Sequence, residues 1–386
     1  MKIAIVADDL TGALDAAVPF ADLGLGTGVG LDIEVASALA GSDRRVVSVD
    51  ACSRHLPPAT AAAVVRSAME RLLALGQRVP FKKIDSTLRG NVGAETLAAL
   101  AGSGRRCAII SPAAPRLGRR LHGGRLLVDG EPVPGGDLMQ ALRLQLPEAS
   151  VHLLAPGEEV RPTGYSTRLF VADAQEETDL DRLVDLALAR PDEILLVGSS
   201  GLAGALARRT DHARSRAAIE APSRCQRILF VVGSRNPRSV EQLQALLDME
   251  EVVDLGGSFG DRPGRPPSSG SGYTRRVGVI HAPGLDDGSS PESVRVAQRL
   301  AEMARSVLSD ELVNDTAIVM TGGDTARSLL DRLGIQVLEV GRSLAPGVVL
   351  SKADLGGRAV SLVTKAGGFG ETDLFVRLVR ELLGEH

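Results

Sequence analysis

The chain has 386 residues, a hydrophobic share of 44% and a net formal charge of −4, so it is long enough for two domains that each bury a core. No block of basic residues stands out and no apolar run approaches the length of a membrane span, which argues against nucleic-acid and membrane partners. The three cysteines lie far apart without metal-ligand spacing, a usage that favours a reducing, cytoplasmic location: Cys52, Cys107 and Cys225.

Along the first half of the chain, short aliphatic runs alternate with stretches of helical periodicity. The runs predicted to be strands are Ile3–Ala7, Arg45–Val49, Phe81–Ile84, Cys107–Ile110, Arg168–Val171 and Glu193–Val197. Apolar spacing of three and four predicts helices over Ala13–Leu23, Ala59–Leu75, Ala94–Ala101, Leu180–Ala189 and Leu202–Arg209. Such alternation is typical of a parallel sheet covered on both faces. Between these elements, Gly118–Val133 is predicted to be a hairpin excursion.

The second half repeats this alternation after a polar, basic stretch at Arg208–Arg224. Its predicted strands are Arg227–Val232, Val277–His281, Ala317–Met320, Val337–Val340 and Ala359–Val363, and its predicted helices are Ser239–Leu247, Pro291–Leu308, Thr325–Leu333 and Thr372–Leu383. Gly260–Ser271 is of low complexity and is predicted to be a mobile loop, to which we assign no role. We therefore predict an α/β protein of two domains, 1–210 and 227–386, joined by a linker at 211–226. Each domain would be a mainly parallel sheet flanked by helices, with the active site in the cleft between them.

Polar turns follow several predicted strands, where open parallel sheets bind their ligands. In the first turn, Asp8 and Asp9 end a strand and Thr11 is expected to cap the next helix. A cap needs only one acceptor. The second carboxylate is therefore free to bind or deprotonate a hydroxyl, or to hold a magnesium ion through water, although a purely structural role stays open.

The second turn mixes cations with a carboxylate. Because Lys82 and Lys83 alternate along a strand, only one of them can face the site, and Asp85 shares a face with Lys83. Small polar and basic residues then crowd the next helix start: Ser86, Thr87, Arg89 and Asn91. Arg54, after another strand, could bind a carboxylate through both arms of its guanidinium. This set suits a small, hydroxylated, anionic molecule, with a solvated ion-pair loop as the alternative.

In the second half, three glycine turns join strands to helices: Gly233-Ser234, Thr321-Gly322-Gly323-Asp324-Thr325 and Gly367-Gly368-Phe369-Gly370. Exposed amides at helix N-termini hold phosphate, so these turns favour a nucleotide, with Lys365 at the mouth of the last one. Only five of the 44 basic residues are lysine, and Lys82, Lys83 and Lys365 all lie in these turns, although five is a small sample. No P-loop motif is present. Glu339 lies near where a ribose-binding acid would be expected, which keeps a dehydrogenase open.

Taken together, the motifs resemble those of the four-carbon acid sugar kinase family, in family order along almost the whole chain. The matching stretches are Ala7–Ala13, Lys83–Asn91, Pro112–Pro115 with Gly118-Arg119, Gly198–Ala203, Gly322–Thr325 and Lys365–Gly370. The resemblance implies an N-terminal domain that binds a tetronate-type acid and a C-terminal domain that binds ATP with magnesium.

Carried over by motif, the resemblance implies ATP contacts at Ser234, Gly322, Gly323, Asp324, Thr325, Gly367, Gly368 and Gly370. It places around the acid sugar Asp8, Asp9, Arg54, Lys83, Asp85 and Arg89. By hypothesis, Lys365 holds the ATP phosphates and Asp85 or Asp9 accepts the proton of the hydroxyl. An NAD-dependent dehydrogenase of a small sugar acid and a non-catalytic sugar-acid sensor are the alternative functions. The sequence leaves the oligomeric state open, with a homodimer as one outcome.

Overall fold

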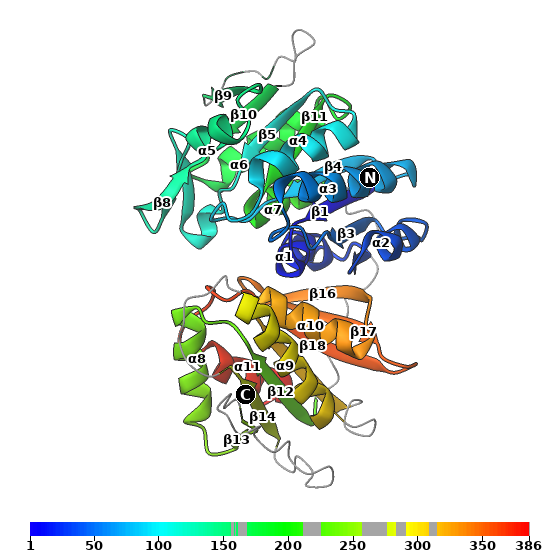
Figure 1. Cartoon of the computed structure of the whole chain (residues 1–386), viewed down its shortest axis with the longest axis vertical. Coiled ribbons are helices and arrows are strands. Elements are labelled where there is room, and N and C mark those ends of the chain that lie inside the picture. Colours follow the sequence, from blue (N-terminus) through cyan, green and yellow to red (C-terminus); the bar gives the residue numbers. More distant parts are fainter. Residues whose placement is uncertain are drawn as a thin grey trace. The chain divides into compact units, whose positions relative to one another are not determined.

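The structure is a computed structural model that describes residues 1–155, 158, 160, 168–210, 225–256, 276–282, 291–308 and 315–385. The chain divides into two compact units, Met1–Ala218 and Ile219–His386 (Figure 1). Most of the predicted linker 211–226 and the whole of the predicted loop Gly260–Ser271 lie outside the described residues. The domain boundaries expected from the sequence therefore stay a prediction.

The first unit is built on parallel strands in the order β2-β3-β1-β4-β11-β5-β10-β9. These strands are β1 (Ile3–Ala7), β2 (Thr27–Gly30), β3 (Val46–Asp50), β4 (Val79–Lys83), β5 (Cys107–Ser111), β9 (Ser150–Leu154), β10 (Arg168–Ala172) and β11 (Ile194–Gly198). The helices of the unit are α1 (Leu10–Asp22), α2 (Ile33–Ala40), α3 (Pro58–Ala74), α4 (Val92–Ser103), α5 (Leu138–Gln145), α6 (Glu177–Leu188) and α7 (Ser200–Arg208). Strands β1, β3, β5 and β11 are buried along their whole length, as expected for a parallel sheet with both faces covered.

Strand β1 lies between β3 and β4, at the point where the chain changes direction across the sheet. The chain leaves β1 to form β2 and β3 on one side and then crosses over to form β4 on the other. Such a switch point opens a crevice at the carboxyl ends of the strands, where α/β proteins bind ligands. The turns that follow β1, β3 and β4 therefore meet at one end of the sheet.

The predicted hairpin excursion is confirmed as a small antiparallel sheet, β6-β7-β8. Its strands are β6 (Arg119–His122), β7 (Arg125–Val128) and β8 (Glu131–Asp137). A short 3-10 helix, η1 (Pro115–Leu117), leads into it. Gly118 then has a φ of +69°, and any side chain there would collide with Asp129. Glycine at this position lets the chain turn directly into β6.

The second unit has its own sheet, in the order β13-β14-β12-β15-β18-β17-β16. Its strands are β12 (Arg227–Val232), β13 (Val252–Asp254), β14 (Val277–His281), β15 (Thr316–Thr321), β16 (Val337–Ala345), β17 (Val348–Asp354) and β18 (Ala359–Lys365). Its helices are α8 (Pro237–Leu247), α9 (Pro291–Val307), α10 (Gly323–Leu333) and α11 (Leu374–Leu383). Strand β12 lies between β14 and β15, which gives this sheet a switch point as well. Phe230 and Phe375 pack in the core beneath it, with ring centroids 5.3 Å apart.

Two strands of the second sheet were not predicted, β13 and β17. β17 runs antiparallel to both β16 and β18, whereas β13, β14, β12, β15 and β18 are parallel. The hairpin between β16 and β17 turns at Pro346 and at Gly347, whose φ is +68°. Strand–helix alternation in the sequence does not predict such a hairpin, because no helix separates its two strands.

Candidate active site

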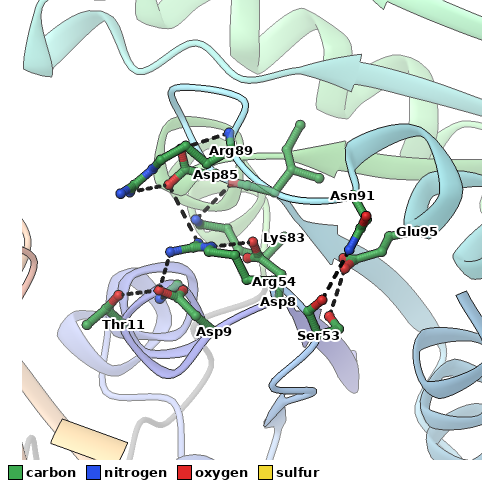
Figure 2. Close-up of polar contacts among 12 residues, drawn as sticks. Asp8, Asp9, Thr11, Ser53, Arg54, Lys83, Asp85, Arg89, Asn91 and Glu95 are labelled. Atoms are coloured by element: carbon green, nitrogen blue, oxygen red, sulfur yellow. Dashed lines mark hydrogen bonds and ion pairs between the residues drawn. The ribbon is translucent and has the colours of Figure 1, made fainter. Parts of the chain in front are cut away.

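Asp8 and Asp9 directly follow β1, and Asp9 caps α1. Asp9 Oδ1 accepts a hydrogen bond from Gly12 N at 2.7 Å, and Thr11 Oγ1 donates to Asp9 Oδ2 at 2.8 Å (Figure 2). The expectation that Thr11 caps the helix was wrong, because the cap position needs extended backbone and Asp9 has it, with φ −145° and ψ 165°. Thr11 instead lies inside the helix and orients the capping carboxylate.

Arg54, in the turn after β3, joins three carboxylates. Its Nε lies 2.8 Å from Asp8 Oδ2, its Nη1 lies 2.5 Å from Asp9 Oδ2, and its Nη2 lies 3.6 Å from Asp85 Oδ1 (Figure 2). Only 13% of the Arg54 side chain is exposed. In the structure this guanidinium holds the protein's own carboxylates together, and the expected contact of Arg54 with a substrate carboxylate stays a prediction.

Asp85 follows β4 and is the most heavily hydrogen-bonded of these carboxylates. Arg89 donates from Nη2 to Oδ1 at 2.8 Å and from Nε to Oδ2 at 3.1 Å, and Thr87 N donates to Oδ2 at 3.0 Å. Burial acts to raise the pKa of Asp85, but the hydrogen bonds and charge of Arg89, with the charge of Arg54, hold it well below its ordinary value. Asp85 is therefore ionised and firmly oriented. The pKa of Asp8 is also lowered, because Arg54, Lys82 and Lys83 outweigh its burial.

The two lysines of β4 point to different neighbours, as the alternation along the strand predicts. Lys83 lies among the site residues, and its Nζ donates to Ile84 O at 2.9 Å (Figure 2). Lys82 is fully buried, and its Nζ lies 2.8 Å from Glu95 Oε2. Glu95 Oε1 in turn accepts a hydrogen bond from Ser53 Oγ at 2.8 Å. The Lys82–Glu95 pair therefore supports the turn that carries Arg54.

Two residues expected to bind substrate use their polar groups within the protein. Asn91 Nδ2 donates to Ser53 O at 3.2 Å and to Leu56 O at 2.9 Å, so its amide nitrogen ties the Arg54 turn to the start of α4. Ser86 Oγ accepts a hydrogen bond from Arg119 Nη1. Substrate contacts by Asn91 and Ser86 stay predictions.

Two residues at this site, Arg119 and Asp15, were not predicted from their sequence positions to be site residues. Arg119, at the start of β6, reaches Ser86, and the Gly118-Arg119 pair was a signal for it. Asp15 lies on α1, three residues after Gly12 and hence on the same helix face. Burial raises the pKa of Asp15, and the opposing influences of Lys83, a hydrogen bond from Ser200 and Arg119 do not cancel that effect. Asp15 therefore differs from Asp8 and Asp85, whose pKa values are lowered.

The absence of a side chain at Gly12 leaves room beside these groups. A Cβ at this position would lie 2.6 Å from Asp9 Oδ1, 3.4 Å from Lys83 Nζ and 3.6 Å from Asp8 Oδ1. Asp8 Oδ1 is buried and has no hydrogen-bond partner within the described part of the chain. A buried carboxylate oxygen is normally paired, so this atom is an acceptor ready for a hydroxyl or a cation.

In the second unit, three predicted turns meet at the ends of neighbouring strands. Ser234 follows β12, Gly322 follows β15 and Gly367 follows β18. A Cβ at Gly367 would collide with Ser234 Oγ, and one at Gly322 would lie 3.4 Å from Ser234 N. Gly322 has a φ of +99° and precedes α10, whose first turn exposes backbone amides. This arrangement is what a phosphate site at a helix N-terminus requires.

The turn at 367–370 is held from below by α8. Gln242 Nε2 donates to Phe369 O at 3.0 Å and to Gly370 O at 3.1 Å, and Ser239 Oγ donates to Gly367 O at 2.7 Å. We expected Lys365 at the mouth of this turn, but its side chain is fully buried. Its Nζ donates to Gly367 O at 2.8 Å and to Ser239 Oγ at 3.0 Å.

A divalent ion would have few protein ligands. Nowhere among the described residues do three His, Cys, Asp or Glu side chains gather as a metal site. Mg²⁺ is commonly held by substrate phosphates, waters and one or two carboxylates, and the residues present fit that mode. Asp324, in the first turn of α10, is the carboxylate nearest in sequence to the glycine turns. In the first unit, Asp8 Oδ1 is a buried carboxylate oxygen without a hydrogen-bond partner among the described residues.

Comparison with known proteins agrees with this division. A family model described as a sugar-binding N-terminal domain matches residues 3–141, and one described as a nucleotide-binding C-terminal domain matches residues 276–375. The chain is 33% identical to a D-threonate kinase of Cupriavidus necator, over 96% of this chain and 95% of that protein. It is 28% identical to a 3-oxo-tetronate kinase of Pseudomonas fluorescens, over 98% of this chain and 96% of that protein.

Two crystal structures share the fold. A Salmonella typhimurium LT2 protein superposes with a TM-score of 0.75 at 23% identity and covers 99% of both chains. The Haemophilus influenzae protein HI1011 superposes with a TM-score of 0.70 at 20% identity, over 98% of this chain and 100% of that chain. With the matched domains and the full-length similarity to named kinases, the chain belongs to the four-carbon acid sugar kinase family.

Proposed function

We propose that this protein transfers the γ-phosphoryl group of ATP to a hydroxyl of a four-carbon acid sugar of the threonate, erythronate or 3-oxo-tetronate type. The observation that carries the proposal is the cluster of ionised side chains at the switch point of the first sheet, in a chain whose relatives are sugar acid kinases. Among the described residues, no helix is long and apolar enough to cross a membrane. A cytoplasmic location, a homodimer and an active site in a cleft between the domains stay predictions.

The acid sugar would be recognised by charge and hydrogen bonding in the first unit. Since Arg54 is engaged by three carboxylates, the cations left to meet the substrate carboxylate are Lys83 and Arg89. The Arg89 side chain is 68% exposed, so it can bind a ligand while it keeps its pairing with Asp85. The open Asp8 Oδ1 would accept a hydrogen bond from a substrate hydroxyl.

The nucleotide would bind in the second unit. Backbone amides near Ser234, Gly322, Gly323 and Gly367 would hold the phosphates, which is the mode of binding that a helix N-terminus favours. Magnesium, when bound, would neutralise phosphate charge during transfer. The remaining predicted ATP contacts are Asp324, Thr325, Gly368 and Gly370, in the same turns.

Asp85 and Asp9 are the proposed groups that orient the reacting hydroxyl and accept its proton. Both are fixed by hydrogen bonds, which suits orientation. The low pKa of Asp85 makes it a weak base, so it would accept the proton only late in the transfer. The variants Asp85→Asn and Asp9→Asn test this role. If both kept near wild-type turnover with intact folding, the assignment of the proton acceptor would be wrong.

A ligand-binding experiment separates the kinase from the two alternatives. An ATP analogue with magnesium should raise the melting temperature of the protein, whereas NAD should not. Stabilisation by NAD instead of ATP would favour the dehydrogenase. Binding of the acid sugar without any ATP turnover would favour the sensor.

A further inference from the structure

Lys365 is a buried lysine that has no acidic partner among the residues that the structure describes. The side chain is 0% exposed at the end of β18. Its Nζ contacts three neutral groups: Ser239 Oγ, Gly367 O and the ring of Phe375, whose centroid lies 5.6 Å away. Within the described residues, no carboxylate forms an ion pair with it or contributes to its electrostatic environment. Buried ammonium groups are normally paired, so an unpaired one calls for a physical reason.

The position of Lys365 beneath the glycine turn suggests that reason. Its Nζ donates to the carbonyl oxygen of Gly367, the first glycine of the turn that is proposed to hold phosphate. The same carbonyl accepts from Ser239 Oγ, and Gln242 fixes the far end of the turn. The ammonium thus lies one layer behind the backbone that would face the ligand. An anion on the other side of that backbone would be its nearest strong countercharge.

Without such an anion, the charged form of Lys365 is disfavoured. Burial, with a smaller contribution from the positive charge of Arg238, lowers the pKa of Lys365 to about 7. Arg238 belongs to α8 and is itself paired with Glu241, with Nη1 3.1 Å from Oε2. The free protein at neutral pH therefore holds this lysine near its titration point, where a nearby negative charge has its greatest effect on protonation.

We propose that Lys365 is a buried countercharge for the nucleotide phosphates. Its ammonium acts on the phosphates through the Gly367–Gly370 turn and does not contact them. When the nucleotide binds, Lys365 takes up one proton from solvent. The inference rests on the proposed nucleotide site of this unit. Lys365 is then a positioning residue, which becomes positively charged when the nucleotide site is occupied. Proton uptake also requires that nucleotide affinity increases as the pH falls from about 9 to about 7.

Calorimetry measures this proton directly. The wild-type protein is titrated at about pH 8 with a non-hydrolysable ATP analogue and magnesium, in buffers whose ionisation enthalpies differ. We expect an uptake of about half a proton or more per nucleotide bound, and a smaller uptake as the pH approaches about 6, where Lys365 is already charged. Tight binding with no uptake at about pH 8 would overturn the inference but leave the proposed function intact. A wild-type protein that binds no nucleotide would overturn both.

Two variants assign the proton to Lys365. Lys365→Arg keeps a positive charge that cannot be removed, so it should bind nucleotide without proton uptake. Lys365→Met should bind about tenfold or more weakly, also without uptake, because both the charge and the bond to Gly367 O are lost. Lys352→Met is the matched control, because it removes a partly exposed lysine from β17 of the same sheet and should titrate like the wild type. Unchanged uptake in a folded Lys365→Arg would contradict the assignment. Even if neither Lys365 variant folds, the absence of proton uptake by the wild type at about pH 8 would overturn the inference.

Discussion

Arg54 Nε donates to Asp8 Oδ2 at 2.8 Å, and the two side chains are 13% and 4% exposed. The pair joins the ends of β3 and β1 at the switch point of the first sheet. Because Asp9 and Asp85 bind the same guanidinium, Arg54 holds three carboxylates close together. The positive charge of Arg54 therefore offsets the repulsion between the three carboxylates of the site.

Arg54→Gln should destabilise the first unit. Breaking a buried ion pair commonly costs about 3–5 kcal/mol, because the remaining charges lose their partner. In the wild type, the lowered pKa values of Asp8 and Asp85 contribute stability that is complete above the ordinary aspartate pKa and is lost as the pH falls below it. In the variant, Asp8 loses the charge and the hydrogen bond of Arg54, so burial raises the pKa of Asp8, whereas Arg89 still holds the pKa of Asp85 low. The deficit in the free energy of unfolding should therefore shrink between about pH 7 and about pH 5.

Denaturant unfolding at the two pH values checks this prediction. Arg71→Gln is the control, because Arg71 pairs with Glu34 at the surface and its loss should cost less than about 1 kcal/mol at either pH. A deficit for Arg54→Gln that grows as the pH falls would be inconsistent with the electrostatic role of Arg54.

The Lys82–Glu95 pair should support the site without contacting substrate. Glu95→Gln leaves the fully buried Lys82 unpaired and should cost about 3–5 kcal/mol, whereas adding Lys82→Met should recover part of that loss. Both variants should raise KM for the acid sugar, because Ser53 loses its carboxylate acceptor beside Arg54. Unfolding and steady-state kinetics on the single and double variants provide the measurement. Equal stability of the single and double variants would show that an unpaired Lys82 is not what destabilises Glu95→Gln.

Gly12→Ala should impair substrate binding more than folding. The new methyl group would lie 2.6 Å from Asp9 Oδ1 and enter the space beside Lys83 Nζ. We expect kcat/KM for the acid sugar to fall at least about tenfold, equivalent to about 1.4 kcal/mol of lost transition-state stabilisation. In the control Gly26→Ala, the nearest atom would be 3.9 Å from the methyl group, so kinetics should be unchanged. If Gly12→Ala kept the wild-type kcat/KM, the acid sugar would not occupy the space beside Lys83 Nζ.

Asp15→Asn should change the pH dependence of the reaction. Since the pKa of Asp15 is raised, its protonation should affect activity at a higher pH than that of an ordinary aspartate. The wild-type kcat/KM should therefore decrease on the acid side, and Asp15→Asn should lose this ionisation. Asp22→Asn, at the far end of α1, is the matched control and should keep the wild-type profile. If kcat/KM decreased at the same acidic pH in the wild type and in Asp15→Asn, the ionisation of Asp15 would not affect the reaction.

The sequence predicted the parallel architecture well, because strand–helix alternation is a local pattern. Ile3–Ala7, Arg227–Val232 and Val277–His281 are strands with the predicted bounds. The antiparallel β17 was missed, because its pairing with β16 and β18 depends on a tight turn and on tertiary packing. The three glycine turns were expected to belong to one site, and the structure places Ser234 against Gly322 and Gly367.

The roles of individual charged residues were harder to predict than their location. Alternation along β4 correctly separated Lys82 from Lys83, but it could not show that Glu95, on α4, is the partner of Lys82. The position of Lys365 next to a glycine turn suggested direct phosphate contact, whereas its side chain turns into the core. Side-chain direction at a strand end depends on the surrounding helices, and that information is not contained in a local motif.

The central claim is tested most directly by ADP release in a coupled assay, with MgATP and a panel of D-threonate, erythronate and 3-oxo-tetronates as acceptors. We predict turnover that depends on both ATP and one of these acids, with stoichiometric formation of a phosphorylated acid. Arg54→Gln and Gly12→Ala should lower this turnover, and Gly26→Ala should not. No acid-dependent ADP release across the whole panel, from a folded protein that binds ATP, would contradict the proposed kinase function.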